Sequence, residues 1–558
     1  MSGITAANKV YDGNTSATLN TSTATLSGAI GGDSVTVAGG SGTFADKNAG
    51  VGKAVSITGL SLNGADASNY TLGTSTASTT ADISKAAISG VSGITVKDKV
   101  YDGTTLATAL TTGASLTGLV SGDQVTIGTL NAAFADRNAG TGKAVNLSNL
   151  ALSGADSSNY TVAGTIAPAT GNITVRPLST WTASGGGAWS SAGNWDALPD
   201  GSNVLAVSIP AGVSVSYDAS AAATQLQSLS VAGGLSLTGG ALSIASGLST
   251  SQYSQSGGSL SLAGAMNVNA SFGQTGGTIA ASGPVSITQS TGNLTVGSIS
   301  ASAISLVAPA GSIGQTGALV TTGLLSTQSS ASTLLNDAGN RIKAFKAVSS
   351  GTGDIALTNV GVIDVQGINT ASGNITVYNT GGISTSGPVI ANGGAAKMTA
   401  NSPLTIGTDG VTATGDITLV ATNLTSAGNL TLNGDLVSSA GAVGLSAANN
   451  LAQNSKVSAA LGISVSAGGT LTLGPTATSF GNPISYSSQG APVAAPPGSQ
   501  TSSGSAPADY VAVFLTQFEK AVVSQETVSV ELPGVTDKEK EKEKEKKTTT
   551  AEGEICLR

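Results

Sequence analysis

Residues 9–13 read Lys-Val-Tyr-Asp-Gly, and residues 99–103 read the same five letters again. The step from Tyr11 to Tyr101 is 90 residues, and the same step relates further matches along the chain. Repeats of this length are typical of tandem modules that form an array. The other matching stretches are Phe-Ala-Asp-Lys-Asn-Ala-Gly at 44–50 with its near copy at 134–140, Gly-Ala-Asp at 64–66 and 154–156, and Ser-Asn-Tyr at 68–70 and 158–160.

The register of the repeat reaches the start of the chain, because Ser-Gly-Ile-Thr at 2–5 matches 92–95. The chain therefore opens between two modules. We expect it to be the C-terminal part of a longer polypeptide. Its first residues lack the charged start and apolar core of a signal peptide, so we expect any export signal to lie upstream. The upstream DNA would show further in-frame copies if this is right.

Composition favours an all-β chain. Its 558 residues leave room for several domains and include 77 glycines, while 40% are apolar and only 9% are charged. Low charge with this apolar content argues against disorder over most of the length. Each glycine inside a helix lowers its stability by roughly 0.5–1 kcal/mol. A chain with this many glycines therefore favours short strands joined by turns.

Several kinds of site are excluded by residue counts. The chain has no histidine, and Cys556 is its only cysteine. One such chain cannot supply a disulfide framework, a Cys/His zinc site or a histidine-dependent nucleophile. We therefore expect no cofactor and no catalytic residues. The four arginines lie far apart in the sequence, so we also expect no nucleic acid partner.

The two modules are predicted to span 1–86 and 87–176. Alternating runs such as Ser-Val-Thr-Val at 34–37 and Ala-Val-Ser-Ile at 54–57 indicate short strands between Gly, Asn and Asp turns. A β-sandwich with an immunoglobulin-like arrangement is the favoured fold. A β-grasp-like fold is the alternative.

All three tryptophans, Trp181, Trp189 and Trp195, fall in a segment at 177–210. We interpret this segment as an aromatic cap at the entry of the next domain, because the end of a solenoid core needs a cover. The alternative is a platform on which carbohydrate rings stack.

A shorter motif recurs from 211 to 490. Gly-Asn-Ile-Thr-Val at 373–377 and Gly-Asp-Ile-Thr-Leu at 415–419 share one pattern, a turn pair followed by alternating apolar and small residues. This pattern predicts a parallel β-helix, in which alternate Leu, Ile and Val point into a stacked core. At roughly 20 residues a coil, the segment would make about 14 coils.

The remaining residues differ in character. We expect a Pro/Ser/Gly linker at 491–508 and an amphipathic helix at 509–526 that begins after Asp509 as its N-cap. This helix would dock on the last coils, or alternatively bind a partner. The Lys/Glu-rich tail at 527–558 is predicted to be solvated and disordered.

The repeated Tyr-Asp-Gly opening, with its later Phe-Ala-Asp and Ser-Asn-Tyr, resembles the YDG modules of bacterial exoproteins. The Gly-Asn-Ile-Thr-Val coils resemble the β-helix of filamentous haemagglutinin-like proteins. This resemblance implies an adhesin of the two-partner secretion type, exported through an outer-membrane transporter and secreted from, or held on, a Gram-negative cell surface. The N-terminal secretion domain of that family is not present in the sequence.

We expect a non-enzymatic role in cell adhesion, in which modules and β-rod act as stalk and adhesive surface toward a receptor or glycan that the sequence does not identify. One alternative is a β-helix enzyme acting on polysaccharide, but Asp354 and Asp416 occupy the same turn corner of the repeat. Another is a calcium-stabilised surface module, although the aspartates are spread along each module and are better explained as turn formers. The repeated signature, interpreted as structural, comprises Tyr11, Asp12, Gly13, Asp46, Tyr70, Tyr101, Asp102, Gly103, Asp136 and Tyr160.

Overall fold

The computed structural model describes residues 1–424, 427–489 and 491–500. Over these residues the chain is all-β, and it contains a parallel β-solenoid of about 13 turns, which confirms the expected fold class. The chain divides into two compact units, Met1–Asn392 and the part from Gly393 onward. The predicted helix at 509–526 and tail at 527–558 lie outside the described residues.

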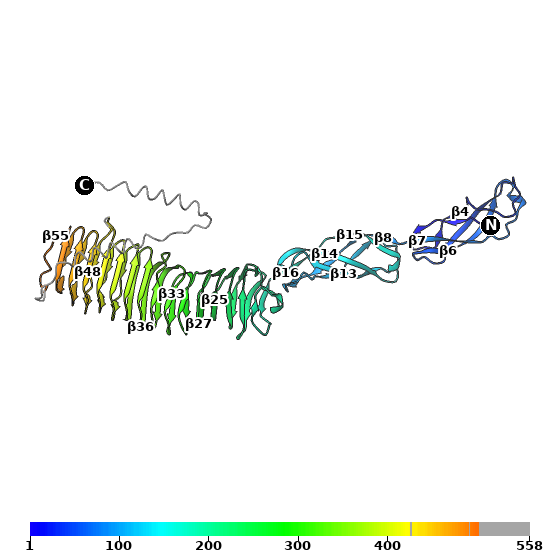
Figure 1. The fold of residues 1–558 in the computed structure, drawn as a ribbon. Coiled ribbons are helices and arrows are strands. Elements are labelled where there is room, and N and C mark those ends of the chain that lie inside the picture. The colour runs from blue at the N-terminus through cyan, green and yellow to red at the C-terminus, as the bar shows by residue number, and fades with distance from the viewer. Residues whose placement is uncertain (425–426, 490, 501–558) are drawn as a thin grey trace, which may run out of the picture. The chain divides into compact units, whose positions relative to one another are not determined.

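The first module contains strands β1 to β7 (Figure 1). Its five-stranded sheet has the order β2-β7-β6-β5-β3, in which β2 lies parallel to β7 and the other pairs are antiparallel. Alternation along β6 buries Val55 and Ile57 while their neighbours face water, which explains the period of two in the sequence. The bounds are β1 Thr5–Ala6, β2 Lys9–Val10, β3 Ser16–Ala17, β4 Leu19–Asn20, β5 Thr36–Phe44, β6 Gly50–Asn63, the 3₁₀ turn η1 Ala67–Asn69 and β7 Ala77–Ser84.

The second module runs from β8 to β16 and repeats the central sheet of the first, with the order β10-β16-β14-β13. Strand β8 pairs in parallel with β15 and antiparallel with β12, so it belongs to this module. The chain thus passes from one module to the next at Lys85. The bounds are β8 Ala86–Ser92, β9 Thr95–Lys97, β10 Lys99–Val100, β11 Thr108–Leu110, β12 Ser115–Thr117, β13 Thr126–Phe134, β14 Gly140–Ser153, η2 Ser157–Asn159, β15 Tyr160–Ile166 and β16 Ala169–Thr174.

Parallel stacking begins earlier than the expected start at 211. Strand β17 pairs with β19, and β18 pairs with β20, all in parallel. The tryptophan segment is therefore part of the first turn of the solenoid, although it lacks the repeat motif of the later coils. The bounds up to Ala301 are β17 Arg176–Thr180, β18 Gly187–Ala188, η3 Ala192–Asn194, β19 Val204–Ile209, β20 Ser214–Tyr217, β21 Thr224–Leu226, β22 Ser228–Val231, β23 Gly234–Leu237, β24 Ala241–Ile244, β25 Leu248–Gln255, β26 Ser259–Leu262, β27 Met266–Gln274, β28 Thr278–Ala281, β29 Val285–Thr288, β30 Leu294–Val296 and β31 Ser298–Ala301.

In the later coils of the first unit, equivalent side chains stack directly on one another. Ile355 pairs with Ile375 in the parallel ladder, and both side chains are fully buried. This stacking follows from the apolar-small-apolar motif, because alternate residues of a strand share one face. The bounds are β32 Ile304–Ala308, β33 Ile313–Gln315, β34 Leu319–Ser329, β35 Thr333–Leu335, β36 Arg341–Thr352, β37 Ile355–Asn359, β38 Ile363–Ser372, β39 Ile375–Asn379, β40 Ile383–Thr385 and β41 Val389–Ala391.

The second unit continues with parallel coils of the same kind, in which Ile417, Val443 and Ile463 form one buried ladder. The last strand among its described residues, β55, is antiparallel to β54, and the backbone N–H of Gln500 donates to Ser479 O at 3.0 Å. Some of the first ten residues of the predicted linker are therefore hydrogen-bonded to the last described coils. The other linker residues lie outside the described residues. The bounds are β42 Ala396–Ala400, β43 Leu404–Ile406, β44 Val411–Ala413, β45 Ile417–Ala421, β46 Leu430–Leu432, β47 Leu436–Ser438, β48 Val443–Ala447, β49 Leu451–Gln453, β50 Lys456–Ala459, β51 Ile463–Ala467, β52 Leu471–Leu473, β53 Thr478–Phe480, β54 Ile484–Ser488 and β55 Ala491–Pro492.

Buried asparagines also stack inside the solenoid. Asn379 is fully buried, and its Nδ2 donates to Gly361 O and Gly382 O, both at 2.7 Å. Its Oδ1 accepts a hydrogen bond from Asn359 Nδ2 at 3.1 Å. The amide thus adds hydrogen bonds to backbone carbonyls at a corner of the coil, where Gly382 O also accepts from the backbone N–H of Ile363 at 3.0 Å.

Replacing Asn379 with alanine is expected to lower the free energy of unfolding by about 1–3 kcal/mol, because the buried Asn359 Nδ2 loses its acceptor and two backbone carbonyls lose the hydrogen bonds from the amide. Asn369 is an exposed asparagine in β38, the strand that precedes β39 in the chain, and N369A is the matched control. Denaturant unfolding followed by circular dichroism measures both variants. Equal stability of N379A and N369A would contradict this account.

Within the residues that the structure describes, no helix has the length and apolar character needed to cross a membrane.

Candidate functional site

The best-defined polar site lies where the first module meets the second. Tyr11, Lys47, Asn48 and Ala49 form one side of it, which we call the socket. Tyr11 directly follows β2, and its backbone N–H donates to Ser84 O on β7 at 2.9 Å. The other three residues lie in the loop between β5 and β6, so the central sheet places both parts of the socket at the same end of the module.

Two aspartates of the signature shape this socket without touching the second module. The Oδ1 of Asp12 accepts from the backbone N–H of Asn14 at 3.1 Å, and the Oδ1 of Asp46 accepts from that of Asn48 at 2.8 Å. Gly13 follows with φ +79°, in the left-handed region that favours glycine. These are the turn roles expected from the sequence. The second module repeats them with Asp102, Gly103 and Asp136.

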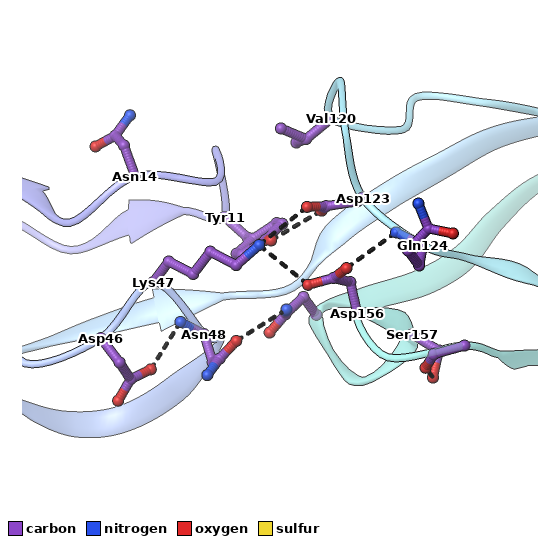
Figure 2. A network of polar contacts seen from close by, with 12 residues as sticks. Tyr11, Asn14, Asp46, Lys47, Asn48, Val120, Asp123, Gln124, Asp156 and Ser157 are labelled. Carbon is purple, nitrogen blue, oxygen red and sulfur yellow. Dashed lines mark hydrogen bonds and ion pairs between the residues drawn. The ribbon is translucent and has the colours of Figure 1, made fainter.

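The opposing face of the second module, which we call the plug, comprises Val120, Asp123, Asp156, Asn159 and Tyr160. The carboxylate of Asp123 is its centre, and the side chain is 4% exposed (Figure 2). Its Oδ2 accepts from the hydroxyls of Tyr11 at 2.8 Å and Tyr160 at 2.6 Å. The Nζ of Lys47 lies 3.1 Å from Asp123 Oδ1 and 3.0 Å from Asp156 Oδ1. One lysine thus pairs with two carboxylates of the neighbouring module.

An amide pair completes the contact. The Oδ1 of Asn159 accepts from the backbone N–H of Ala49 at 2.8 Å, and its Nδ2 donates to Asn48 Oδ1 at 3.2 Å. Asn159 is 1% exposed, so its end of both bonds is shielded from water. Both bonds join neutral groups, and because one side chain accepts at Oδ1 and donates at Nδ2, the pair fixes the orientation of Asn159 as well as its distance.

Electrostatics in the joint favour the ionised carboxylate and the protonated lysine. Burial alone would raise the pKa of Asp123, but the hydrogen bonds from Tyr160, Tyr11 and Lys47 together lower it. The hydrogen bond to Asp156, followed by those to Tyr11 and Asp123, raises the pKa of Lys47. The rings of Tyr11 and Tyr160 meet edge to face, with 5.5 Å between centroids.

Burial and the hydrogen bond to Asp123 raise the pKa of Tyr160 to about 12. A tyrosine in an unfolded chain titrates near pH 10. Because the folded pKa is the higher one, the stability contributed by this hydroxyl is complete below about pH 10 and lost as the pH rises through about 12. We expect the difference in tyrosinate absorbance between the wild-type chain and Y160F to be a single titration centred near pH 12. A midpoint near pH 10 would contradict the buried joint.

The same joint recurs where the second module meets the solenoid. The hydroxyl of Tyr101 donates to Asp200 Oδ1 at 2.6 Å and to Leu198 O at 2.9 Å. Arg137, which stands where the first module has Lys47, forms an ion pair with the other carboxylate oxygen of Asp200. Burial, then the hydrogen bond to Asp200, raises the pKa of Tyr101.

The amide pair is also repeated at this second joint. The backbone N–H of Ala139 donates to Asn203 Oδ1 at 2.7 Å, and Asn203 Nδ2 donates to Asn138 Oδ1 at 3.0 Å. Asp200 is 7% exposed and Asn203 is 5% exposed. The segment after the tryptophans belongs to the first coil, and it presents to the second module the same two residue types, an aspartate and an asparagine, that the second module presents to the first.

The three tryptophans lie directly under this second joint. Their rings pack edge to face, with centroids 4.9 Å apart for Trp181 and Trp195 and 4.8 Å apart for Trp189 and Trp195. They are 1–5% exposed, and each indole N–H donates to a backbone carbonyl of the same segment. Rings buried to this extent offer no face on which a sugar can stack, which speaks against the platform alternative.

Sequence reasoning identified only the tyrosines of each joint. It selected Tyr11, Tyr101 and Tyr160, whose hydroxyls meet the central aspartates, but it assigned Asp123 and Asp156 to turns. The 90-residue recurrence contained the signal, because Lys47 and Arg137 recur with the same sign of charge. Missed residues are Lys47, Asn48, Ala49, Asp123, Asp156 and Asn159 at the first joint, and Arg137, Asn138, Ala139, Asp200 and Asn203 at the second.

Other charged side chains of the described residues are dispersed. In the solenoid, Asp354 Oδ1 accepts from the backbone N–H of Asn374 and Asp416 Oδ1 from that of Ala442, both at 2.8 Å. These are the turn corners expected from the motif. Across residues 1–424, 427–489 and 491–500, no three His, Cys, Asp or Glu side chains converge as metal ligands would.

Comparison with known families gives one match. Residues 1–80 and residues 85–169 each match the YDG domain model. No curated protein and no solved structure matches the chain. The two modules are thus YDG domains, and their repeated Tyr-Asp-Gly supplies the tyrosine at the centre of each joint.

Proposed function

We propose that this chain is the stalk and adhesive surface of a secreted or surface-held bacterial exoprotein of the filamentous haemagglutinin type, without enzymatic activity. In this proposal a partner transporter of the outer membrane exports it by two-partner secretion. YDG domains and a β-solenoid in one chain are compatible with such a protein. The observation that carries the proposal is the reuse of one joint at two successive boundaries.

The joint suits a stalk because it resists hinging. Each boundary is closed by a buried aspartate that binds a tyrosine hydroxyl and a cation, and by an asparagine that binds the backbone of the next module. A boundary made only of a flexible linker would leave neighbouring domains free to rotate. Fixed joints transmit position along the array, which is what a stalk requires of its parts.

Adhesion can be tested with the intact chain. Cys556 is the only cysteine, so the protein can be coupled to maleimide beads at one known point. We expect these beads to be retained on at least one member of a panel of mammalian cells, bacterial cells and immobilised glycans. Beads carrying the same chain after heat unfolding are the control.

Two results would count against the proposed function. One is retention no greater than that of the control beads on every surface of the panel. The other is turnover of a polysaccharide by the soluble chain, followed as the appearance of new reducing ends or unsaturated products. The second result would favour the β-helix enzyme alternative.

A further inference from the structure

The first YDG domain also has a plug, and it is built like the plug of the second. The hydroxyl of Tyr70 donates to Asp33 Oδ2 at 2.6 Å, as Tyr160 donates to Asp123 in the second domain. The backbone N–H of Ile30 donates to the Tyr70 oxygen at 3.0 Å, where Val120 does the same to Tyr160 at 2.9 Å.

The second carboxylate of this face is held in the same way. Asp66 Oδ2 accepts from the backbone N–H of Ser34 at 2.9 Å, and Asp156 Oδ2 accepts from that of Gln124 at 2.9 Å. The preceding glycine explains the shared geometry. A Cβ on Gly64 would lie 2.1 Å from Ser34 O, so the loop approaches too closely for any other residue. The plug therefore has its shape without a partner in contact with it.

The two plugs differ in whether a neighbouring module covers them. Ile30 is 70% exposed, and Asn69 is exposed where its counterpart Asn159 is 1% exposed. In the second domain the tyrosine, lysine and backbone N–H of a socket cover this face. No ion pair to Asp33 or Asp66 occurs among the described residues, so the face presents two carboxylates and an apolar side chain to solvent.

We propose that the face formed by Ile30, Asp33, Asp66, Asn69 and Tyr70 binds the socket of a further YDG module. The charges match, because a socket provides Lys or Arg for the carboxylates. Its turn after Tyr-Asp-Gly also provides a recess for the apolar residue, since a Cβ on Gly13 would lie 2.8 Å from Val120 Cγ1. The inference concerns assembly of the array and does not depend on adhesion.

The occupant is a tandem module in the same polypeptide. Both sockets of this chain are filled, one by the second YDG domain and one by the first coil of the solenoid. A second copy of the chain therefore has no free socket to offer. A module placed ahead of Met1 at the 90-residue spacing would have a free socket. The lysine of that module equivalent to Lys47 would then meet Asp33 and Asp66.

The test duplicates residues 1–90 ahead of the full 558-residue chain and uses carbodiimide, which joins lysine to carboxylate without a spacer. Both the original and the extended chain are expected to give a Lys47 link to Asp123 or Asp156. Only the extended chain should give a Lys47 link to Asp33 or Asp66, identified by mass spectrometry of the cross-linked peptides. Absence of that link while the Asp123 or Asp156 link persists would overturn the proposal.

Asn69 supplies a variant whose effect depends on the added module. In the original chain N69A is expected to leave the protein unchanged, whereas N159A should weaken the first joint roughly tenfold through loss of a buried hydrogen-bond partner. In the extended chain N69A should reduce the new cross-link by a similar factor. An N69A variant that lowers stability in the original chain, or dimers of the original chain in sedimentation, would contradict the assignment.

Discussion

Replacing Trp189 with alanine is expected to destabilise the first coil of the solenoid by about 3–5 kcal/mol, the usual cost of removing a large buried aromatic side chain. Trp189 is 1% exposed and packs against Trp195 and Tyr217, with ring centroids 4.8 Å and 5.2 Å away. Its Nε1 donates to Pro199 O at 2.8 Å. The variant therefore loses apolar contacts and a hydrogen bond, and it leaves a cavity.

The position of Pro199 gives this variant a second, local effect. Pro199 lies between Leu198 and Asp200, which are the residues that contact Tyr101. Loss of the indole should therefore loosen the second joint and leave the first unchanged. Hydrogen exchange separates the two, because the amide of Ala139 reports the second joint and the amide of Ala49 reports the first.

Two further variants control the tryptophan experiment. W189F keeps an aromatic ring but loses the N–H donor, so it should be less damaging than W189A. Leu178 in β17 is 48% exposed, and L178A should change stability by no more than about 0.5 kcal/mol. Faster exchange at Ala49 and Ala139 in equal measure would show that the indole has no local role at the second joint.

The solenoid was predictable because each repeat contains the residues that determine its own turn and buried strand face. Gly-Asn-Ile-Thr-Val specifies a corner and the inward face of a strand, and stacking follows when neighbouring coils share that pattern. The start of the solenoid was not predictable. Its first coil contains β17 and β18, which lack the motif, and it is recognised only by its parallel pairing with later strands.

The joints show a different limit. Asp46 and Asp123 both recur at 90 residues, as Asp136 and Asp33, yet one aspartate shapes its own turn and the other binds the next module. Recurrence shows that each module has the residue. It does not show whether the residue contacts its own module or the next one. Asp200 gave even less signal, since it lies outside the repeat and meets Tyr101 only because the first coil places it there.

Replacing Asp123 with alanine is expected to open the joint between the two YDG domains. The carboxylate accepts from two tyrosine hydroxyls and pairs with Lys47, and hydrogen bonds to a charged group each contribute about 1.5–3 kcal/mol. Because Lys47 retains Asp156 as a partner, we expect a net loss of about 2–3 kcal/mol. The amide of Ala49 should then exchange roughly 30- to 150-fold faster.

The chain provides its own control for this prediction. D33A removes the matching aspartate of the first domain, which binds Tyr70 on an exposed face, so it should cost less than about 1 kcal/mol and leave Ala49 protected. D123N retains an acceptor of the same shape while removing the charge, and it should fall between the two. The amide of Ala139, which belongs to the second joint, should be unchanged in all three variants.

Acid should have the same effect as the substitution. The pKa of Asp123 is lowered in the folded joint, so its contribution to stability is present above the unfolded value near 3.9 and is lost as the pH falls through the folded value. Protection of Ala49 should therefore persist at pH 5 and fall only under strongly acidic conditions in the wild-type chain. D123A should show a smaller acid step at this amide, because only the pair between Lys47 and Asp156 remains to be lost. If D123A and D33A expose Ala49 equally, the aspartate acts within its own module, and the repeated joint is not what holds the array together.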